Sequence, residues 1–115
     1  LKAFALFFQN SIRDVDTIAR YGGEEFVILL PDADKEAAFS LAERLRVGLD
    51  QTAREKLPPI TMSLGVATYP EDGTDIEGLI KKADAAMYAA KRAGRNKSVK
   101  YAEQLMRSIS LEGEK

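Results

Sequence analysis

Three stretches of the chain carry apolar residues at the three- and four-residue spacing that is typical of one face of an α-helix. The spacing predicts helices over residues 2–12, from Asp32 or Asp34 to residue 55, and over residues 76–93. The apolar positions are, in order, Phe4, Leu6 or Phe7, Phe8 and Ile12; Ala38, Leu41, Ala42, Leu45 and Leu49; and Leu79, Ile80, Ala83, Ala86, Met87 and Ala90.

Two short runs, residues 17–21 and 24–30, have the length and composition of β-strands. A Gly-Gly pair stands between them and favours a two-residue hairpin turn, because both turn positions need a positive φ. The apolar run at residues 26–30 is continuous, which is typical of a central strand that is covered on both faces. Residues 60–69 and 98–101 predict two further strands.

The elements follow the order helix, hairpin, helix, strand, helix, strand. This order predicts an α+β fold in which helices pack on one mostly antiparallel sheet. Ferredoxin-like topologies start with a strand, whereas this chain starts within a helical pattern that has no capping residue. We therefore expect a fold that lacks its first strand. Residues 1–101 would form the C-terminal portion of a domain, and residues 102–115 a tail of uncertain order.

Composition narrows the chemistry that this chain can perform. Its 115 residues allow one domain, and 17 basic against 18 acidic residues give a net charge of −1, which argues against nucleic acid as a partner. The chain has neither cysteine nor histidine, so thiol nucleophiles, histidine bases and metal sites with Cys or His ligands are excluded. Carboxylates, basic side chains and hard cations remain. No apolar run approaches the length of about 18 residues that a membrane span needs, so we expect no membrane contact by this segment.

Glu24 and Glu25 directly follow the glycine pair of the expected hairpin. Glycines let a ligand approach the backbone closely, and a carboxylate beside them is a hard oxygen ligand that suits Mg²⁺ and phosphate substrates. Adjacent strand residues point to opposite faces, so only one of the two acids can face a given site. A solvated hairpin with acidic residues explains the same four residues without any ligand.

Basic residues stand at the ends of two of the expected helices. Arg13 and Asp16 follow the first helix and could offer a guanidinium fork and an acceptor to one ligand, or form a salt bridge at the helix end. Lys91 and Arg95 lie four residues apart near the end of the last helix and could reach one phosphate cluster together. Compensation of the helix dipole explains this second pair equally well.

Taken together, these residues resemble a known family. Residues 19–27, with the letters ARYGGEEFV, resemble the hallmark motif of the GGDEF family in its GGEEF form. Residues 63–67 (SLGVA) are similar to the family's following strand, residues 82–91 (KADAAMYAAK) to its last helix, and residues 94–96 (GRN) close the match. The four motifs occur in the family's order and spacing, and the resemblance covers residues 1–101.

The resemblance implies a diguanylate cyclase, in which two GTP molecules become cyclic di-GMP and two pyrophosphates. It also implies a ferredoxin-like sheet related to the palm of nucleotide cyclases and polymerases. The active species would be a homodimer in which each domain holds one GTP and each 3′-hydroxyl attacks the α-phosphate of the other GTP. Phosphoryl transfer assisted by Mg²⁺ or Mn²⁺ needs carboxylates and can dispense with histidine.

The resemblance further implies roles for the residues that match the family's active site. Glu24 corresponds to the catalytic acid, which binds the metal and accepts the proton of the 3′-hydroxyl, and Glu25 corresponds to a second acid at the metal. The residues expected against or around the GTP phosphates are Gly22, Gly23, Lys91 and Arg95.

A second implied site binds the product. Arg13 and Asp16 match the RxxD inhibitory motif for cyclic di-GMP, at the family's distance before the glycine pair. Arg44 matches a basic residue that completes this allosteric site in some members. The alternative function is therefore a receptor module that binds cyclic di-GMP without turnover, and a generic α+β interaction domain is a third hypothesis.

The chain departs from the family pattern at its N-terminus. The family's domain opens with a strand that bears a metal-binding Asp, followed by a helix segment with Asn and Asp that read guanine, and this sequence has no counterpart of them. We therefore expect the 115-residue chain alone to make no cyclic di-GMP and to self-associate through exposed strand edges. We expect a cytoplasmic location for this segment, whether or not the parent protein is anchored to a membrane through other domains.

Overall fold

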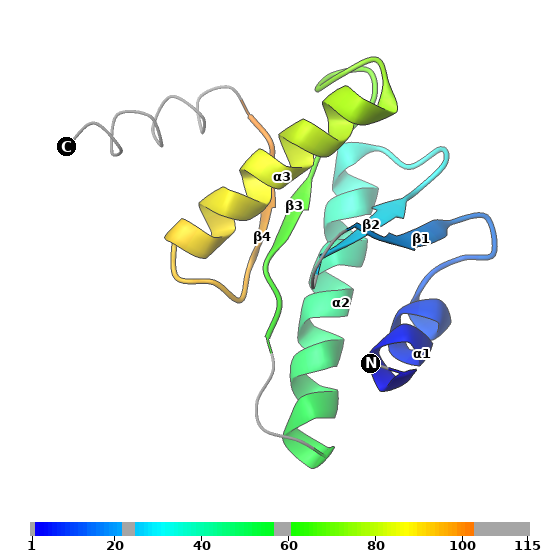
Figure 1. Cartoon of the computed structure of the whole chain (residues 1–115), viewed down its shortest axis with the longest axis vertical. Coiled ribbons are helices and arrows are strands. Elements are labelled where there is room, and N and C mark those ends of the chain that lie inside the picture. The colour runs from blue at the N-terminus through cyan, green and yellow to red at the C-terminus, as the bar shows by residue number, and fades with distance from the viewer. Residues whose placement is uncertain (1, 22–24, 57–60, 103–115) are drawn as a thin grey trace. The chain divides into compact units, whose positions relative to one another are not determined.

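A computed structural model describes residues 2–21, 25–56 and 61–102 of the chain (Figure 1). The chain divides into two compact units, Leu1–Ala33 and Asp34–Lys115, and each is described by itself. The class is α+β, as expected, and all three expected helices are present. The elements in chain order are α1 (Lys2–Ser11), β1 (Thr17–Arg20), β2 (Phe26–Leu29), α2 (Lys35–Lys56), β3 (Leu64–Val66), α3 (Ile76–Arg92) and β4 (Ser98–Lys100).

The first unit consists of α1 and the antiparallel pair of β1 and β2. Phe8 of α1 is buried, and its ring centroid lies 5.4 Å from that of Phe26 on β2. Phe26 is nevertheless 39% exposed and Leu29 is 41% exposed. The expectation of a doubly covered strand at residues 26–30 is therefore wrong. Within the described part of this unit β2 pairs with β1 alone, and an apolar run is buried only where other elements cover it.

The hairpin loop is longer than expected. The N–H of Tyr21 donates to the carbonyl oxygen of Glu25 at 2.8 Å, so three residues stand inside this bonded pair. A two-residue turn would bond residues three apart in the sequence, and that prediction is wrong. The three enclosed residues, 22–24, lie outside the described part of the chain.

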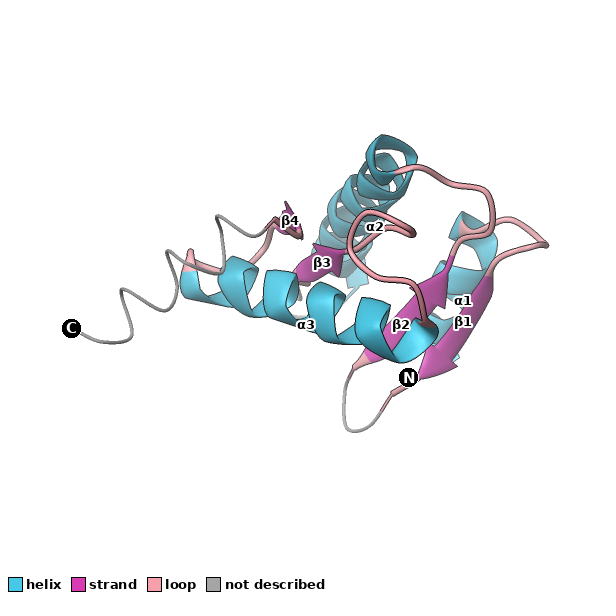
Figure 2. Cartoon of the chain, turned by 90° about the horizontal axis from the view of Figure 1, so that it is seen from above, coloured by secondary structure: helices cyan, strands magenta, loops and turns pink. Residues whose placement is uncertain are grey.

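The second unit is a two-stranded sheet between two helices. β3 and β4 run parallel, with Leu64 opposite Ser98. α3 covers one face of this pair and α2 covers the other, which the two perpendicular views show (Figures 1 and 2). The buried residues come from all of these elements and from the segments that follow the strands: Ala42, Leu45, Leu49, Val66, Thr68, Ala86, Ala89, Ala90 and Tyr101.

Two small sheets replace the single, mostly antiparallel sheet that we expected. A hairpin joins β1 to β2 and makes them antiparallel, whereas the crossover helix α3 joins β3 to β4 and makes them parallel. The strand expected at residues 60–69 is shortened to β3, because its partner β4 is itself only three residues long. The missing first strand stays a prediction. The tail beyond residue 102 lies outside the described residues.

Gly65 lets α3 lie directly on β3. A Cβ atom added at Gly65 would collide with the backbone carbonyl of Ala83 and the amide nitrogen of Met87. Alanines at positions 86 and 90 of α3 are fully buried, which keeps the helix close to the sheet. The glycine of the SLGVA motif therefore has a structural role, since only a residue without a side chain fits between the helix and the strand.

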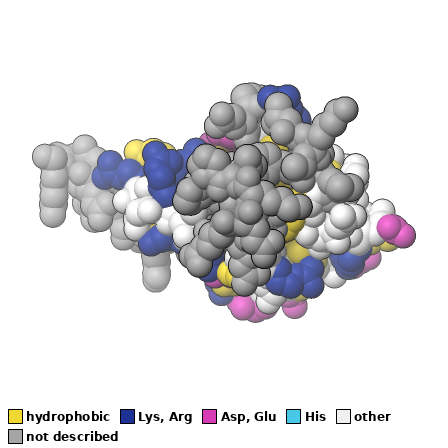
Figure 3. Space-filling model, turned by 90° about the horizontal axis from the view of Figure 1, so that it is seen from below, with side chains coloured by type: hydrophobic (Ala, Val, Ile, Leu, Met, Phe, Trp, Pro, Cys, Tyr) yellow, Lys and Arg dark blue, Asp and Glu magenta, His cyan; other side chains and the backbone are white. Residues whose placement is uncertain are grey.

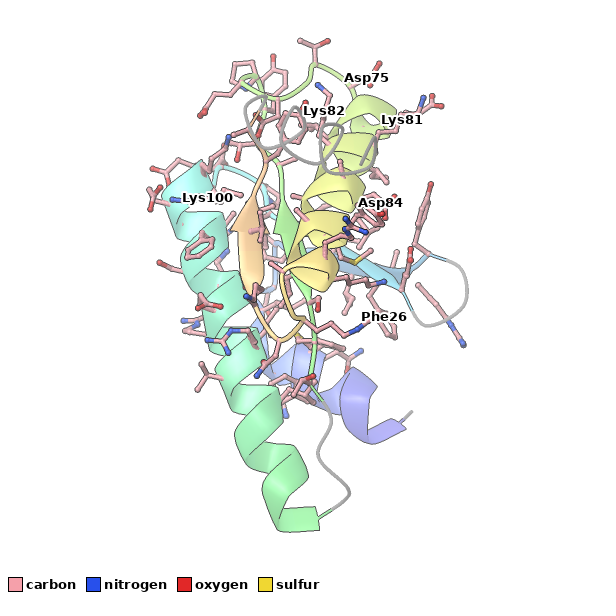
Figure 4. All side chains as sticks on the ribbon, turned by 90° about the vertical axis from the view of Figure 1, so that its left-hand side faces the viewer. Phe26, Asp75, Lys81, Lys82, Asp84 and Lys100 are labelled. Atoms are coloured by element: carbon pink, nitrogen blue, oxygen red, sulfur yellow. The ribbon has the colours of Figure 1, made fainter. Side chains whose placement is uncertain are left out.

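Side-chain caps define where the helices of the second unit begin. The Asp34 carboxylate accepts the N–H of Ala37 at 2.8 Å, so Asp34 rather than Asp32 caps α2. The carboxylate of Asp75, at the start of α3 in Figure 4, accepts the N–H of Gly78 at 2.7 Å. Short polar side chains thus satisfy backbone N–H groups that have no partner within the helix.

Ion pairs tie α2 to the rest of the second unit. The ammonium of Lys35 lies 2.9 Å from the largely buried carboxylate of Asp72, which also accepts the N–H of Thr68 at 2.8 Å. Lys100 of β4 reaches back over α2 (Figure 4), where it pairs with Glu36 at 2.7 Å. No described helix is long and apolar enough to cross a membrane.

Candidate functional site

The C-terminal end of α3 carries the two residues expected to bind phosphate. The N–H of Gly94 donates to the carbonyl of Lys91 at 3.4 Å, and the N–H of Arg95 donates to the carbonyl of Ala90 at 2.9 Å. These two bonds form a Schellman motif, in which the chain folds back over the helix end. Gly94 occupies the position at which a left-handed glycine is most common.

The backbone remains left-handed for three residues in this turn. The φ angles are 115° at Gly94, 65° at Arg95 and 48° at Asn96. A left-handed conformation costs about 1–2 kcal/mol for an ordinary residue and less for asparagine. Arg95 is therefore held in a strained conformation by its surroundings. Strain of this kind persists only where neighbouring groups impose it, and it is common at functional sites.

Lys91 and Arg95 are both exposed at this end of α3. Arg95 stands beyond the last helical residue, so the two side chains do not have the helical four-residue spacing that we expected. The Schellman bond brings the backbone of Arg95 back to the helix end, so both residues lie at this end of α3. In the view of Figure 3 the Lys and Arg side chains form separate groups among acidic and apolar ones.

Arg13 and Asp16 form a closed turn after α1. The N–H of Asp16 donates to the carbonyl of Arg13 at 3.0 Å, and the N–H of Arg13 donates to the Asp16 carboxylate at 2.8 Å. The guanidinium reaches both carboxylate oxygens, with Nη2 2.7 Å from Oδ1, and Nη2 also donates to the carbonyl of Pro31 at 2.9 Å. The salt bridge that we considered as one interpretation of this pair is therefore present.

The two side chains of this salt bridge differ in their exposure and in the direction in which the pKa of each is shifted. The Asp16 side chain is 1% exposed, whereas the Arg13 side chain is 53% exposed. The hydrogen bond from Arg13 lowers the pKa of Asp16 although burial opposes it, and the same bond raises the pKa of Arg13. Both groups are thus charged at neutral pH, and the guanidinium has a face open to a ligand. Arg44 is exposed on α2, in the second unit.

The described residues do not form the expected metal site. Glu24 lies outside them together with Gly22 and Gly23, and Glu25 is exposed. Within the described ranges no three or more Asp, Glu, His or Cys side chains are close enough to hold a metal ion. Magnesium needs a near-octahedral set of oxygen ligands, and one exposed carboxylate does not supply it.

A polar network between α2 and the turn after α3 was not apparent from the motifs. Arg46 donates to both carboxylate oxygens of Glu43, from Nε at 2.6 Å and from Nη2 at 3.1 Å. Its Nη1 donates to the side-chain oxygen of Asn96 at 3.3 Å, and the hydroxyl of Ser98 donates to Glu43 at 2.9 Å. The only sequence signal is the three-residue spacing of Glu43 and Arg46, which is common on exposed helix faces.

Comparison with known proteins identifies the family. The family described as "Diguanylate cyclase, GGDEF domain" matches residues 1–97. The chain is 36% identical to the active GGEEF domain of a diguanylate cyclase from Vibrio cholerae; the match has a TM-score of 0.81 and covers 90% of this chain and 67% of that one. The chain belongs to the GGDEF diguanylate cyclase family. The resemblance seen in the motifs is confirmed at this level.

Two further relatives place this GGDEF domain in context. Diguanylate cyclase DgcM of Escherichia coli is 42% identical over 97 residues, which cover 84% of this chain and 23% of DgcM. The GGDEF domain of DgcB from Caulobacter crescentus, solved in complex with c-di-GMP, is 31% identical with a TM-score of 0.72, and the match covers 84% of this chain and 60% of that one. The chain thus spans under a quarter of the length of DgcM.

Proposed function

We propose that this GGDEF domain is part of a diguanylate cyclase that condenses two GTP molecules into cyclic di-GMP and two pyrophosphates. In each half-reaction a bond forms between a 3′-oxygen and an α-phosphorus, and the bond from that phosphorus to the pyrophosphate oxygen breaks. The observation that carries the proposal is the family match over residues 1–97, which includes an intact GGEEF motif. Two copies of the domain would face each other, because each GTP supplies a hydroxyl to the other.

The proposed active-site roles fall on two segments. Glu24 accepts the proton of the attacking 3′-hydroxyl, and Glu24 and Glu25 are the proposed ligands of Mg²⁺ or Mn²⁺, which when bound neutralises phosphate charge. The two glycines before them leave room for the phosphates. Lys91 and Arg95 bind the phosphates from the end of α3, where both are exposed.

The decisive experiment is Glu24→Gln in the protein that contains this chain. The amide keeps the shape of the side chain but can neither take up the hydroxyl proton nor carry the negative charge that a cation needs. We expect this variant to lose the conversion of GTP into cyclic di-GMP, which is measured by chromatography. Glu77→Gln, an identical change at an exposed position in the first turn of α3, is the matched control and should retain activity. Near-normal turnover in Glu24→Gln would refute the proposal.

A second proposed role is inhibition by the product. Arg13 and Asp16 would bind cyclic di-GMP, with Arg44 as a further contact, because a guanidinium and a carboxylate can pair with the phosphate and guanine edges of this ligand. The open face of Arg13 in its turn supports the proposal. Loss of one charge-assisted contact should weaken binding of cyclic di-GMP by about ten- to a hundredfold.

Calorimetry on Arg13→Ala measures this effect, with Arg92→Ala as a control that removes an equal charge from α3. Unchanged affinity in Arg13→Ala would rule the product site out. If the unmodified protein, with Glu24 intact, binds cyclic di-GMP but never turns over GTP, this result would favour the receptor function instead.

A further inference from the structure

The left-handed turn after α3 is held from two sides. On the helix side, the N–H of Arg95 bonds the carbonyl of Ala90. On the other side, the Asn96 side chain accepts a hydrogen bond from Arg46 of α2, and Ser98 donates to Glu43 of the same helix. The hydrogen bonds to α2 therefore involve residues on both sides of position 97.

The part of α2 that makes these hydrogen bonds carries an ion pair. Glu43 and Arg46 form a two-bond pair between neighbouring positions of one helix, and both side chains are partly buried. The hydrogen bond from Arg46 lowers the pKa of Glu43, against the effect of burial, and the bond from Ser98 adds to it. The carboxylate is thus ionised at neutral pH and fixes the plane of the guanidinium, whose Nη1 is aimed at Asn96.

Arg95 is the residue that this arrangement constrains. It stands between Gly94 and Asn96 in a left-handed conformation that an arginine does not adopt by preference. If the Asn96 amide were released, the bond from Ser98 to Glu43 would be the remaining side-chain bond described between this segment and α2. Arg95 could then relax toward ordinary backbone angles, which would change the direction in which its side chain leaves the turn.

We propose that Arg46, acting through Asn96, is a positioning residue that holds the Arg95 guanidinium beside Lys91 for the triphosphate of GTP. This inference rests on the proposed function, in which Lys91 and Arg95 bind the phosphates. Arg46 itself touches neither the substrate nor the reacting atoms. Its effect on GTP is wholly indirect, and this distinguishes it from a binding residue.

The test measures, by calorimetry, the affinity for GTP with Mg²⁺ of the protein that contains this chain. Asn96→Gly removes the amide while keeping a residue that tolerates the left-handed backbone, and Arg46→Met removes the donor. We expect each substitution to weaken GTP binding by about three- to tenfold, because one hydrogen bond that positions Arg95 is lost. Arg46→Lys, which keeps a donor and the charge, should restore part of the affinity. Arg92→Met, which removes one charge from the last turn of α3, should change it by less than about twofold.

The same substitutions in an Arg95→Ala background separate positioning from a general structural role. If Arg46 acts through Arg95, then Arg46→Met and Asn96→Gly should cause no further loss of affinity once Arg95 is absent. Equal losses in both backgrounds, or unchanged affinity in both single variants, would overturn the inference. If Arg46→Met does not fold, as judged by its thermal transition, Asn96→Gly alone decides.

The proposed function fails in a different way. If the unmodified protein that contains this chain does not bind GTP, or if its Arg95→Ala variant binds GTP equally well, then phosphate binding at the end of α3 is wrong. The positioning role falls with it. If Arg95→Ala weakens binding and the Arg46 and Asn96 variants do not, the proposed function stands and only the positioning role is refuted.

Discussion

The two units of this domain treat similar apolar sequences very differently. In the second unit, Leu45 of α2 is 1% exposed, because α2 packs on the β3–β4 pair. In the first unit, Leu29 of β2 belongs to an even more apolar run and is 41% exposed. The comparison shows that burial of an apolar run is favourable, but whether the run is buried depends on which other elements of the chain cover it.

The units also differ in what holds them together. The second unit relies on backbone contact between α3 and β3 at Gly65, on small buried alanines and on the Lys35–Asp72 pair. The first relies on one aromatic cluster around Phe8 and on the turn formed by Arg13 and Asp16. The following experiments test whether stability is distributed in this way.

The largest effect is expected from Gly65→Ala. The new methyl group would collide with backbone atoms of α3, which cannot move aside as a side chain can, so α3 must leave β3. We expect a loss of about 3 kcal/mol or more in the free energy of unfolding, measured with urea. Gly94→Ala is the control: an added Cβ meets only the end of the Lys97 side chain, at 4.0 Å, together with an unfavourable φ, so the loss should be about 1–2 kcal/mol. Equal losses in both variants would contradict close packing of α3 on β3.

A matched pair of leucine substitutions measures the difference between the units directly. Leu45→Ala removes a side chain from the core of the second unit and should cost about 3 kcal/mol. Leu29→Ala removes the same atoms from a side chain that is nearly half exposed and should cost about 1 kcal/mol or less. Native-state hydrogen exchange reports each unit separately. Similar costs at the two positions would mean that β2 is covered in solution.

The pair formed by Lys35 and Asp72 should contribute more than ion pairs at the surface. Burial is the largest single influence and lowers the pKa of Lys35, but the hydrogen bonds and charges of Asp72 and Glu71 together outweigh it, and the pKa is raised overall. Asp72→Asn leaves a partly buried ammonium without its main partner, so we expect a loss of about 2 kcal/mol. Glu36→Gln breaks the exposed pair with Lys100 and should cost less than about 0.5 kcal/mol in the same urea titration.

The smallest effect is a pH dependence to which each unit contributes one group. The pKa of Asp16 lies below its ordinary value of 3.8 and that of Glu43 below 4.5, because each accepts hydrogen bonds from an arginine. A carboxyl whose pKa is lowered by folding stabilises the folded state above its unfolded pKa, and this contribution is lost as the pH falls through the folded pKa. Unfolding followed from pH 7 to pH 2 should show declining stability below about pH 4.5. Asp16→Asn should make the stability of the first unit fall less steeply as the pH is lowered, and it should leave the second unit unchanged. An unchanged slope for the first unit would contradict the lowered pKa of Asp16.

Local patterns were sufficient for the helices and for the family. Periodic apolar positions located all three helices, and the last of them ends at Arg92, one residue before its predicted end. The motif letters identified the GGDEF family, because their order and spacing do not depend on knowing the fold. The choice between Asp32 and Asp34 as a cap needed the structure, in which Asp32 adopts a φ of 58° within a turn.

Strand pairing and exposure could not be obtained in this way. The direction of β3 relative to β4 depends on the crossover through α3, and the exposure of Phe26 depends on neighbours that are distant in sequence. The three-residue loop between Tyr21 and Glu25 also escaped prediction, because the glycine pair is compatible with more than one hairpin.

The sequence by itself determined the helices, the family and the list of charged residues at the proposed sites, since these depend on local spacing and residue type. Only the tertiary structure decided how those charges are held. It closed Arg13 and Asp16 into one turn, carried Arg95 beyond the helix into a left-handed turn, and brought Arg46 of α2 to Asn96 across 50 positions of chain. The physical reason is that hydrogen bonds between distant segments are formed by packing, and no pattern along the chain records which helix face will lie opposite which turn.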